Sequence, residues 1–212
     1  MRTRHLWLVV LTALGLGCNV SLNKDVTIED GRRSDLGCNS INGSIRIGDD
    51  CVLNGEYRSI NGSIEVGRGS SVRKLQSVNG GIRVLDGGTI ERGIDAVNGS
   101  VELGMGASVT RGSIKTVNGS VELDSASVRD DIVTFNGNIR LDRQSVVQGD
   151  IRIKHGKNRQ DHDTEPLTVE VANGSVVYGD IIAHREGRKV QVLLSNGGQV
   201  KGKVVGATIV QK

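Results

Sequence analysis

The segment Ala96-Val97-Asn98-Gly99-Ser100-Val101 returns twenty residues later as Thr116-Val117-Asn118-Gly119-Ser120-Val121, and this repetition decides the fold. Six such segments follow one another, and their asparagines lie 19, 18, 19, 20 and 18 residues apart. The six asparagines are Asn42, Asn61, Asn79, Asn98, Asn118 and Asn136. Degenerate Asn-Gly copies recur at Asn173 and Asn196. Self-similarity at a short, nearly constant period predicts a stacked repeat architecture.

Apolar residues recur at fixed distances from each asparagine. The third and fifth residues after Asn98 are Val101 and Leu103, and the other five asparagines are followed in the same way. After a turn rich in Gly, Ser and Asp, the next inward residues are expected at Leu53, Val72, Ile90, Val109, Val128 and Val146. Four residues before the next asparagine come Tyr57, Leu75, Ile94, Ile114 and Ile132. This pattern predicts about three short strands and three bends per repeat.

Two β architectures accommodate such a repeat. Asn-Gly between apolar residues is a hairpin signal, so an antiparallel meander is the alternative. A meander needs a reversing turn after every strand, whereas only one bend per repeat carries Asn-Gly. We therefore predict an all-β, right-handed parallel β-helix of about 19-residue coils, with the hand taken from parallel crossovers. Stacking would align the six asparagines in a ladder, at a corner whose left-handed backbone Asn and Gly tolerate.

The residue four positions after each asparagine is charged and is expected to face outward. The row reads Arg46, Glu65, Arg83, Glu102, Glu122 and Arg140. Parallel strands lie about 4.8 Å apart, so neighbours in this row should touch. The signs mostly alternate, and Glu102 beside Glu122 is the one like-charge contact.

The N-terminal residues read as an export signal. Arg2 and Arg4 precede an apolar run at residues 6–16, and Gly17-Cys18 follows. The run is too short to span a bilayer but fits a signal peptide over residues 1–17. The end of this run resembles the lipobox of bacterial lipoproteins, which implies a lipid on Cys18 and an exported protein of the outer membrane or cell envelope. Ordinary cleavage, with Cys18 uninvolved, is the alternative.

Charge and composition exclude some functions. The chain has 27 Lys and Arg against 24 Asp and Glu, and removing Arg2 and Arg4 leaves 25 − 24 = +1. A nearly neutral domain gives no reason to expect nucleic acid as a partner. Aromatic residues are nearly missing, so Val, Ile and Leu must fill the core. No nucleophile elbow, phosphate-binding loop or zinc motif is present.

After the expected signal at residues 1–17, the domain plan has two parts. Residues 18–37 are expected to form a linker or N-terminal cap, and residues 38–212 the β-helix. Residues 154–166 are polar and hold the only proline, which predicts a loop ejected from one coil. His155, Asp161, His162 and Asp163 within it match no metal-site spacing, so we expect a solvated loop, no metal and no cofactor. The Asn-Gly-Ser triplets are read as turns rather than glycosylation sites.

Cys38 and Cys51 both fall on inward positions of the first full repeat. Export to an oxidising compartment makes a disulfide between them our prediction. Two buried free thiols are the alternative.

The repeated Val-Asn-Gly-Ser-Val segments resemble the adhesin-like β-strand repeat family of unknown function, over about residues 39–141. Later segments, such as Gly149-Asp150-Ile151 and Gly179-Asp180-Ile181, resemble more weakly the bactofilins, which are polymer-forming cytoskeletal β-helix proteins. The first resemblance implies a surface or secreted protein. The export signal argues against a cytoskeletal role.

These observations favour a non-enzymatic, lipid-anchored envelope protein that acts as a scaffold, an adhesin-like module or a polymer subunit. A polysaccharide-acting β-helix enzyme and a carbohydrate- or ligand-binding module are the alternatives. The expected partners are the membrane, reached through the lipid, and either an envelope protein or a second copy joined end to end. The apolar strand-like run at residues 204–212, in which Lys212 is the one charged residue, would present the strand edge for that contact.

Overall fold

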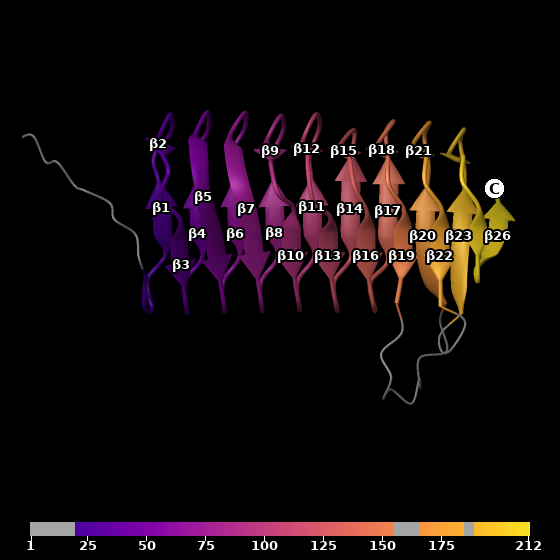
Figure 1. Cartoon of the computed structure of the whole chain (residues 1–212), viewed down its shortest axis with the longest axis horizontal. Helices are drawn as coiled ribbons and strands as arrows, with labels where there is room; N and C mark the ends of the chain where they lie inside the picture. Colours follow the sequence, from indigo (N-terminus) through magenta and orange to yellow (C-terminus); the bar gives the residue numbers. More distant parts are fainter. Residues whose placement is uncertain (1–19, 155–165, 185–188) are drawn as a thin grey trace, which may run out of the picture.

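The computed structural model of the chain describes residues 20–154, 166–184 and 189–212. About nine coils are stacked along one axis, from β1 at one end to β26 at the other (Figure 1). Within the described residues, every strand pairing is parallel, which confirms a parallel β-solenoid and excludes the antiparallel meander. The right hand of the coiling stays a prediction.

Two sheets make the walls. The ten-stranded sheet runs, in spatial order, through β1 (Val26–Ile28), β4 (Ile45–Ile47), β6 (Ile64–Val66), β8 (Ile82–Val84), β11 (Val101–Leu103), β14 (Val121–Asp124), β17 (Ile139–Asp142), β20 (Leu167–Val171), β23 (Val190–Leu194) and β26 (Thr208–Gln211). The sixteen-stranded sheet runs through β24 (Gln199–Val200), β21 (Val176–Val177), β18 (Val146–Val147), β15 (Ser127–Val128), β12 (Ser108–Val109), β9 (Thr89–Ile90), β7 (Ser71–Ser77), β10 (Ile94–Ala96), β13 (Ile114–Thr116), β16 (Ile132–Thr134), β19 (Ile151–Ile153), β22 (Ile181–Ala183) and β25 (Val204–Val205). It also contains β2 (Arg33–Ser34) and β3 (Cys38–Ser40), which pair with β5 (Val52–Ser59), and β5 in turn pairs with β7.

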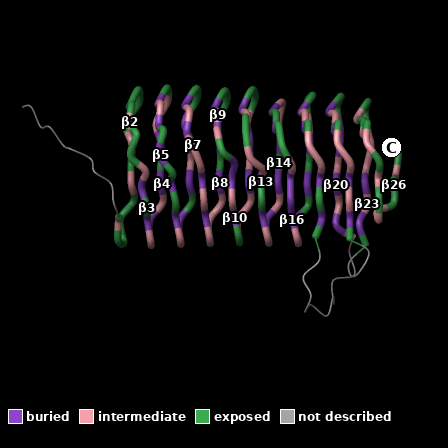
Figure 2. The backbone as a smooth tube through the Cα atoms, viewed as in Figure 1, coloured by how far each residue is buried: buried purple, intermediate pink, exposed green. Residues whose placement is uncertain are grey.

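Equivalent residues of successive coils lie directly over one another. Val101 pairs with Ile82 on one side and with Val121 on the other. The side chains at the predicted inward positions fill the centre. Buried segments recur from coil to coil along the middle of the stack (Figure 2). Val101 is fully buried and Leu103 is 2 % exposed. The β-branched and leucine residues therefore form a continuous aliphatic column, which offsets the scarcity of aromatics.

One predicted inward position, Val146, was wrong, and one apolar position of the repeat lies outside the inward pattern. The apolar residue before each asparagine faces outward: Val97 is 38 % exposed, and its equivalents are partly exposed. The preceding small residue is buried in its place, because the side chains of a strand alternate between its two faces. Val147, not Val146, pairs with Val128 and is buried, since the preceding turn holds one extra residue.

The stack begins earlier than the expected boundary at residue 38. β1 pairs with β4 and β2 pairs with β5, so residues that were expected to form a linker or cap already belong to a coil. The expected signal at residues 1–17 and the lipidation site Cys18 lie outside the described residues. So does the expected loop, apart from its flanking Lys154 and Pro166. The described residues contain no helix long and apolar enough to cross a membrane.

Candidate functional site

The six predicted asparagines form a hydrogen-bonded ladder along one corner of the stack. Each Nδ2 donates to the Oδ1 of the asparagine in the preceding coil. The bond from Asn98 to Asn79 is 2.9 Å long, and the bond from Asn118 to Asn98 is 2.7 Å long. The other bonds join Asn42 to Asn23, Asn61 to Asn42, Asn79 to Asn61, and Asn136 to Asn118. The amides therefore tie together seven successive coils.

The glycine after each asparagine is required for space, not for a left-handed backbone. A Cβ on Gly119 would overlap the carbonyl oxygen of Gly99, the equivalent glycine one coil below. Among the described residues, none of the six predicted ladder asparagines has positive φ. The left-handed positions lie at another corner, for example at Asp50 and Gly87, so our reason for this Asn-Gly pair was wrong.

Buried hydroxyl groups form hydrogen bonds on the inner side of the same corner. Ser59 Oγ donates to the carbonyl oxygen of Gly43 at 3.0 Å and accepts from the backbone N–H of Gly62 at 3.0 Å. Thr116 Oγ1 donates to the carbonyl oxygen of Gly119 at 3.2 Å, and Thr134 Oγ1 accepts from the backbone N–H of Gly137 at 3.1 Å. The signal for these contacts was present in the sequence, because Ser or Thr stands two residues before five of the six ladder asparagines, with Ala96 before Asn98.

The late Asn-Gly copies belong to a different corner from the ladder. Val171 pairs with Leu141, which places Asn173 in the turn after the ten-stranded sheet. There Asn196 Nδ2 donates to Asn173 Oδ1 at 3.0 Å, and Asn173 Nδ2 donates to Asp142 Oδ1 at 2.6 Å. They are not continuations of the first ladder, although they form a second, shorter one.

The predicted disulfide between Cys38 and Cys51 is absent. Cys51 is a buried free thiol whose Sγ lies 3.2 Å from the carbonyl oxygen of Glu29. The two cysteines occupy different walls of the coil: Cys38 begins β3 and pairs with Tyr57, whereas Cys51 lies in the bend before β5 and bonds Ser70.

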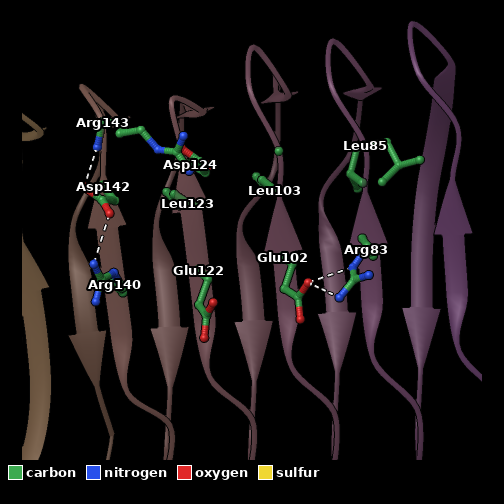
Figure 3. A pocket seen from close by; sticks show the side chains of 12 residues that line it. Arg83, Leu85, Glu102, Leu103, Glu122, Leu123, Asp124, Arg140, Asp142 and Arg143 are labelled. Atoms are coloured by element: carbon green, nitrogen blue, oxygen red, sulfur yellow. Dashed lines mark hydrogen bonds and ion pairs between the residues drawn. The ribbon is translucent and has the colours of Figure 1, made fainter.

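A shallow groove of about 340 Å³ follows the outer face of the ten-stranded sheet (Figure 3). Four residues of the predicted charged row line it, together with residues of the next turn; the four are Arg83, Glu102, Glu122 and Arg140. Arg83 binds Glu102 through two nitrogens, at 2.6 and 2.7 Å. Arg140 contacts both Asp142, at 3.0 Å, and Glu170, at 3.2 Å. Most carboxylates of the groove are therefore neutralised by an arginine.

Glu122 is the exception in this row. It lies in register between Glu102 and Arg140, and it makes no ion pair within the described residues. In the next turn, Asp124 Oδ2 contacts Arg143, while Asp124 Oδ1 is buried without a hydrogen-bond donor among the described groups. The like-charge contact of Glu102 and Glu122, predicted from the sequence, is thus part of the groove.

The perturbed carboxyl groups are held in their ionised form. The Asn173 amide, followed by Arg140, lowers the pKa of Asp142 below its usual value. Arg152, followed by the backbone N–H of Asp180, lowers the pKa of Asp150. Hydrogen bonds to a carboxylate favour its charged form. These groups are therefore suited to structural ion pairing rather than to donating a proton near neutral pH.

Comparison with protein-family models, with curated proteins and with solved structures finds no match to this chain. Over residues 20–154, 166–184 and 189–212, no group of three or more His, Cys, Asp and Glu side chains is placed to hold a metal ion. The candidate site thus consists of one groove and two amide ladders on a regular rod. The chain is a parallel β-solenoid repeat protein.

Proposed function

We propose that this protein is a non-enzymatic structural module of a bacterial cell envelope, anchored to a membrane by a lipid on Cys18. The observation that carries the proposal is the unbroken stack, in which the ten-stranded sheet runs from β1 to β26 around an aliphatic core. Each coil contacts its neighbours, so the molecule is a rod with a repetitive surface. The lipobox-like sequence before Cys18 supports the anchor, and the resemblance to adhesin-like repeats supports a surface role.

The groove argues for a structural role over an enzymatic one. Glycoside cleavage needs a carboxylic acid whose pKa is raised, beside a second carboxylate. Here Glu102 is bound by Arg83, and the pKa of Asp142 is lowered. The groove wall is therefore an ion-pair network that fixes the register of neighbouring coils.

One observation favours a second candidate, a module that binds a charged polysaccharide. Glu122 lies unpaired among the described residues of an open groove, and its carboxylate is available for a cationic sugar. Binding of cationic and neutral polysaccharides by the protein and by Glu122→Gln tests this candidate. Saturable binding of the cationic polymer that the substitution weakens would support it, whereas a structural role predicts no such binding.

Labelling with a radioactive fatty acid in a bacterial host tests the anchor. We expect the wild-type protein to carry label and to partition with membranes. Cys18→Ser should lose the label and yield either soluble protein or unprocessed precursor. Cys51→Ser is the matched control and should keep the label, because Cys51 is buried in the first coils. Equal labelling of Cys18→Ser and wild type would contradict the proposal.

A further inference from the structure

Exposed apolar side chains are concentrated at the two ends of the stack. Eight large apolar residues are exposed within the described chain, and five of them lie in the first coil or the last strands. These five are Val20, Leu22, Leu36, Val205 and Ile209. Scattered exposed apolar residues are normal, but their concentration in the first and last coils of one rod indicates ends that pack against another molecule.

The last strand, β26, has an unpaired edge at the same end of the stack as the exposed Val205 and Ile209. Ile209 of β26 pairs with Val192 of β23 and therefore occupies an inward position, yet it is 50 % exposed. Among the described residues no strand lies on the outer edge of β26, so its backbone N–H and C=O groups face outward along that edge.

The two ends are incomplete in complementary ways. Near the N-terminal end, Ser21 bridges to Ser40, so this segment occupies the wall of the sixteen-stranded sheet in a coil that has no described strand in the ten-stranded sheet. At the other end, β26 is a strand of the ten-stranded sheet with no described strand after it. Each partial coil supplies the wall that the other lacks.

We propose that the C-terminal end of one copy docks on the N-terminal end of a second copy, with β26 pairing in parallel with β1. The repeat fixes the register of this joint, because β26 and β1 both occupy the same place in a coil. Ile209 then covers Val26, Val210 covers Thr27, and Lys212 meets Glu29. In the other wall, Val205 covers Val20, which is 59 % exposed in the single copy.

The charges of the two ends favour unlike ends over like ends. Residues 189–212 contain four lysines and no acidic residue. Residues 20–37 contain three basic and four acidic residues, which gives 3 − 4 = −1. Two C-terminal ends would therefore repel each other, whereas a C-terminal and an N-terminal end attract. A contact between unlike ends leaves one of each free, so it extends into a chain of copies.

The inference deepens the proposed structural role by naming a second copy as the partner, and its test is independent of the anchor. Single cysteines at outward positions probe the register in the otherwise intact chain. Thr27→Cys and Val210→Cys, in separate copies, should lie about 4.8 Å apart at the joint, within the range of a disulfide. Thr208→Cys lies on the same face, two residues away from the register position, and is the matched control.

Mixing the Thr27→Cys and Val210→Cys proteins under mild oxidation should give a reducible dimer. The mixture of Thr27→Cys with Thr208→Cys should give at least ten-fold less. In light scattering at rising concentration, Ile209→Lys should weaken association at least ten-fold, while Val210→Lys, whose side chain faces outward, should change it little.

Three results would overturn the joint. They are equal cross-linking by Thr208→Cys, a homodimer of Val210→Cys alone as the main product, and a strictly monomeric wild-type protein over the whole concentration range. A monomeric protein that still incorporates fatty acid through Cys18 would overturn the joint alone and leave the anchored structural module in place.

Discussion

Val101 and Glu102 are neighbours in the chain with opposite surroundings. Val101 is fully buried between Ile82 and Val121, whereas the Glu102 side chain is 41 % exposed and pairs with Arg83. Val101→Asp would bury a carboxylate without a partner, and we expect a loss of more than about 4 kcal/mol in the free energy of unfolding. Glu102→Gln should cost less than about 1 kcal/mol, because an exposed ion pair contributes little. Similar losses in urea denaturation would contradict the inward and outward assignment.

The ionisation of Tyr57 should make the free energy of unfolding depend on pH in the alkaline range. Burial, followed by the nearby Cys51, raises the pKa of Tyr57 from 10.0 to about 12. The neutral phenol is therefore favoured in the folded state, and its contribution is complete below pH 10 and is lost as the pH rises towards 12. A difference of about two units between the folded and unfolded pKa of Tyr57 contributes about 3 kcal/mol to the free energy of unfolding.

Tyr57→Phe removes this titration, so its stability should fall less than that of the wild type between pH 10 and 12. At neutral pH the variant should lose about 1 kcal/mol, because Tyr57 Oη donates to the carbonyl oxygen of Leu36 at 3.0 Å. Urea denaturation at pH 8, 10 and 11.5 measures both effects. Parallel losses in the two proteins would show that Tyr57 titrates alike in the folded and unfolded states.

Residue identity predicted the straight parts of each coil better than its corners. The third and fifth residues after each asparagine are buried as expected, because alternation along a strand is strictly periodic. At the corner, hydrophobicity alone does not predict which of Ser77 and Val78 turns inward: Ser77 is buried, whereas Val78 is partly exposed. The pairing of cysteines depends on which wall each occupies, and spacing along the chain does not give that.

At the level of strands and turns, the close approach of the corners is the strictest constraint. A Cβ on Gly80 would overlap the carbonyl oxygen of Gly62 one coil below. A Cβ on the next residue, Gly81, would lie 3.3 Å from its nearest neighbour, the carbonyl oxygen of Ser100. Other coils carry serine at this position. We therefore expect Gly80→Ala to cost more than about 2 kcal/mol, since the backbone of two coils must move.

Gly81→Ser is the matched control and should change stability by less than about 1 kcal/mol, because lost freedom in the unfolded chain offsets the tighter packing. Thermal denaturation of the two variants measures the difference. If Gly80→Ala melts with the wild type, the corners are farther apart than the structure places them.

Irregular turns explain where the predicted register slipped. Both Arg143 and Gln144 adopt positive φ in a turn that holds one residue more than its predecessor, and this moves the buried position to Val147. The same corner takes up Asn173 and Asn196, whose Asn-Gly pairs imitate the ladder motif. Equal sequence motifs can thus serve different corners, and only the strand pairing distinguishes them.

For the whole molecule, stability should be distributed along the rod. In a stack where each coil touches only its neighbours, the free energy of unfolding is approximately a sum of coil and interface contributions. The charged row contributes to these interfaces one by one. Arg83 pairs with Glu102 and Arg140 with Glu170 across neighbouring coils, while Glu102 and Glu122 repel. The regular repeat made this architecture predictable from the sequence. The predicted start of the β-helix was placed too late because Lys24 stands where the repeat has glycine.

The central claim is that the coils are interchangeable layers, and deleting one of them tests it most directly. Removing residues 99–118 joins Asn98 to Gly119 and takes out one complete coil of twenty residues. Val121 then stacks on Ile82, and Arg83 meets Glu122, which removes the like-charge contact. We expect a cooperative thermal transition and an unchanged β circular-dichroism spectrum per residue. Removing only residues 99–108 breaks the register and should unfold the protein; equal loss of structure in the two deletions would contradict the stacked coil as the unit of this fold.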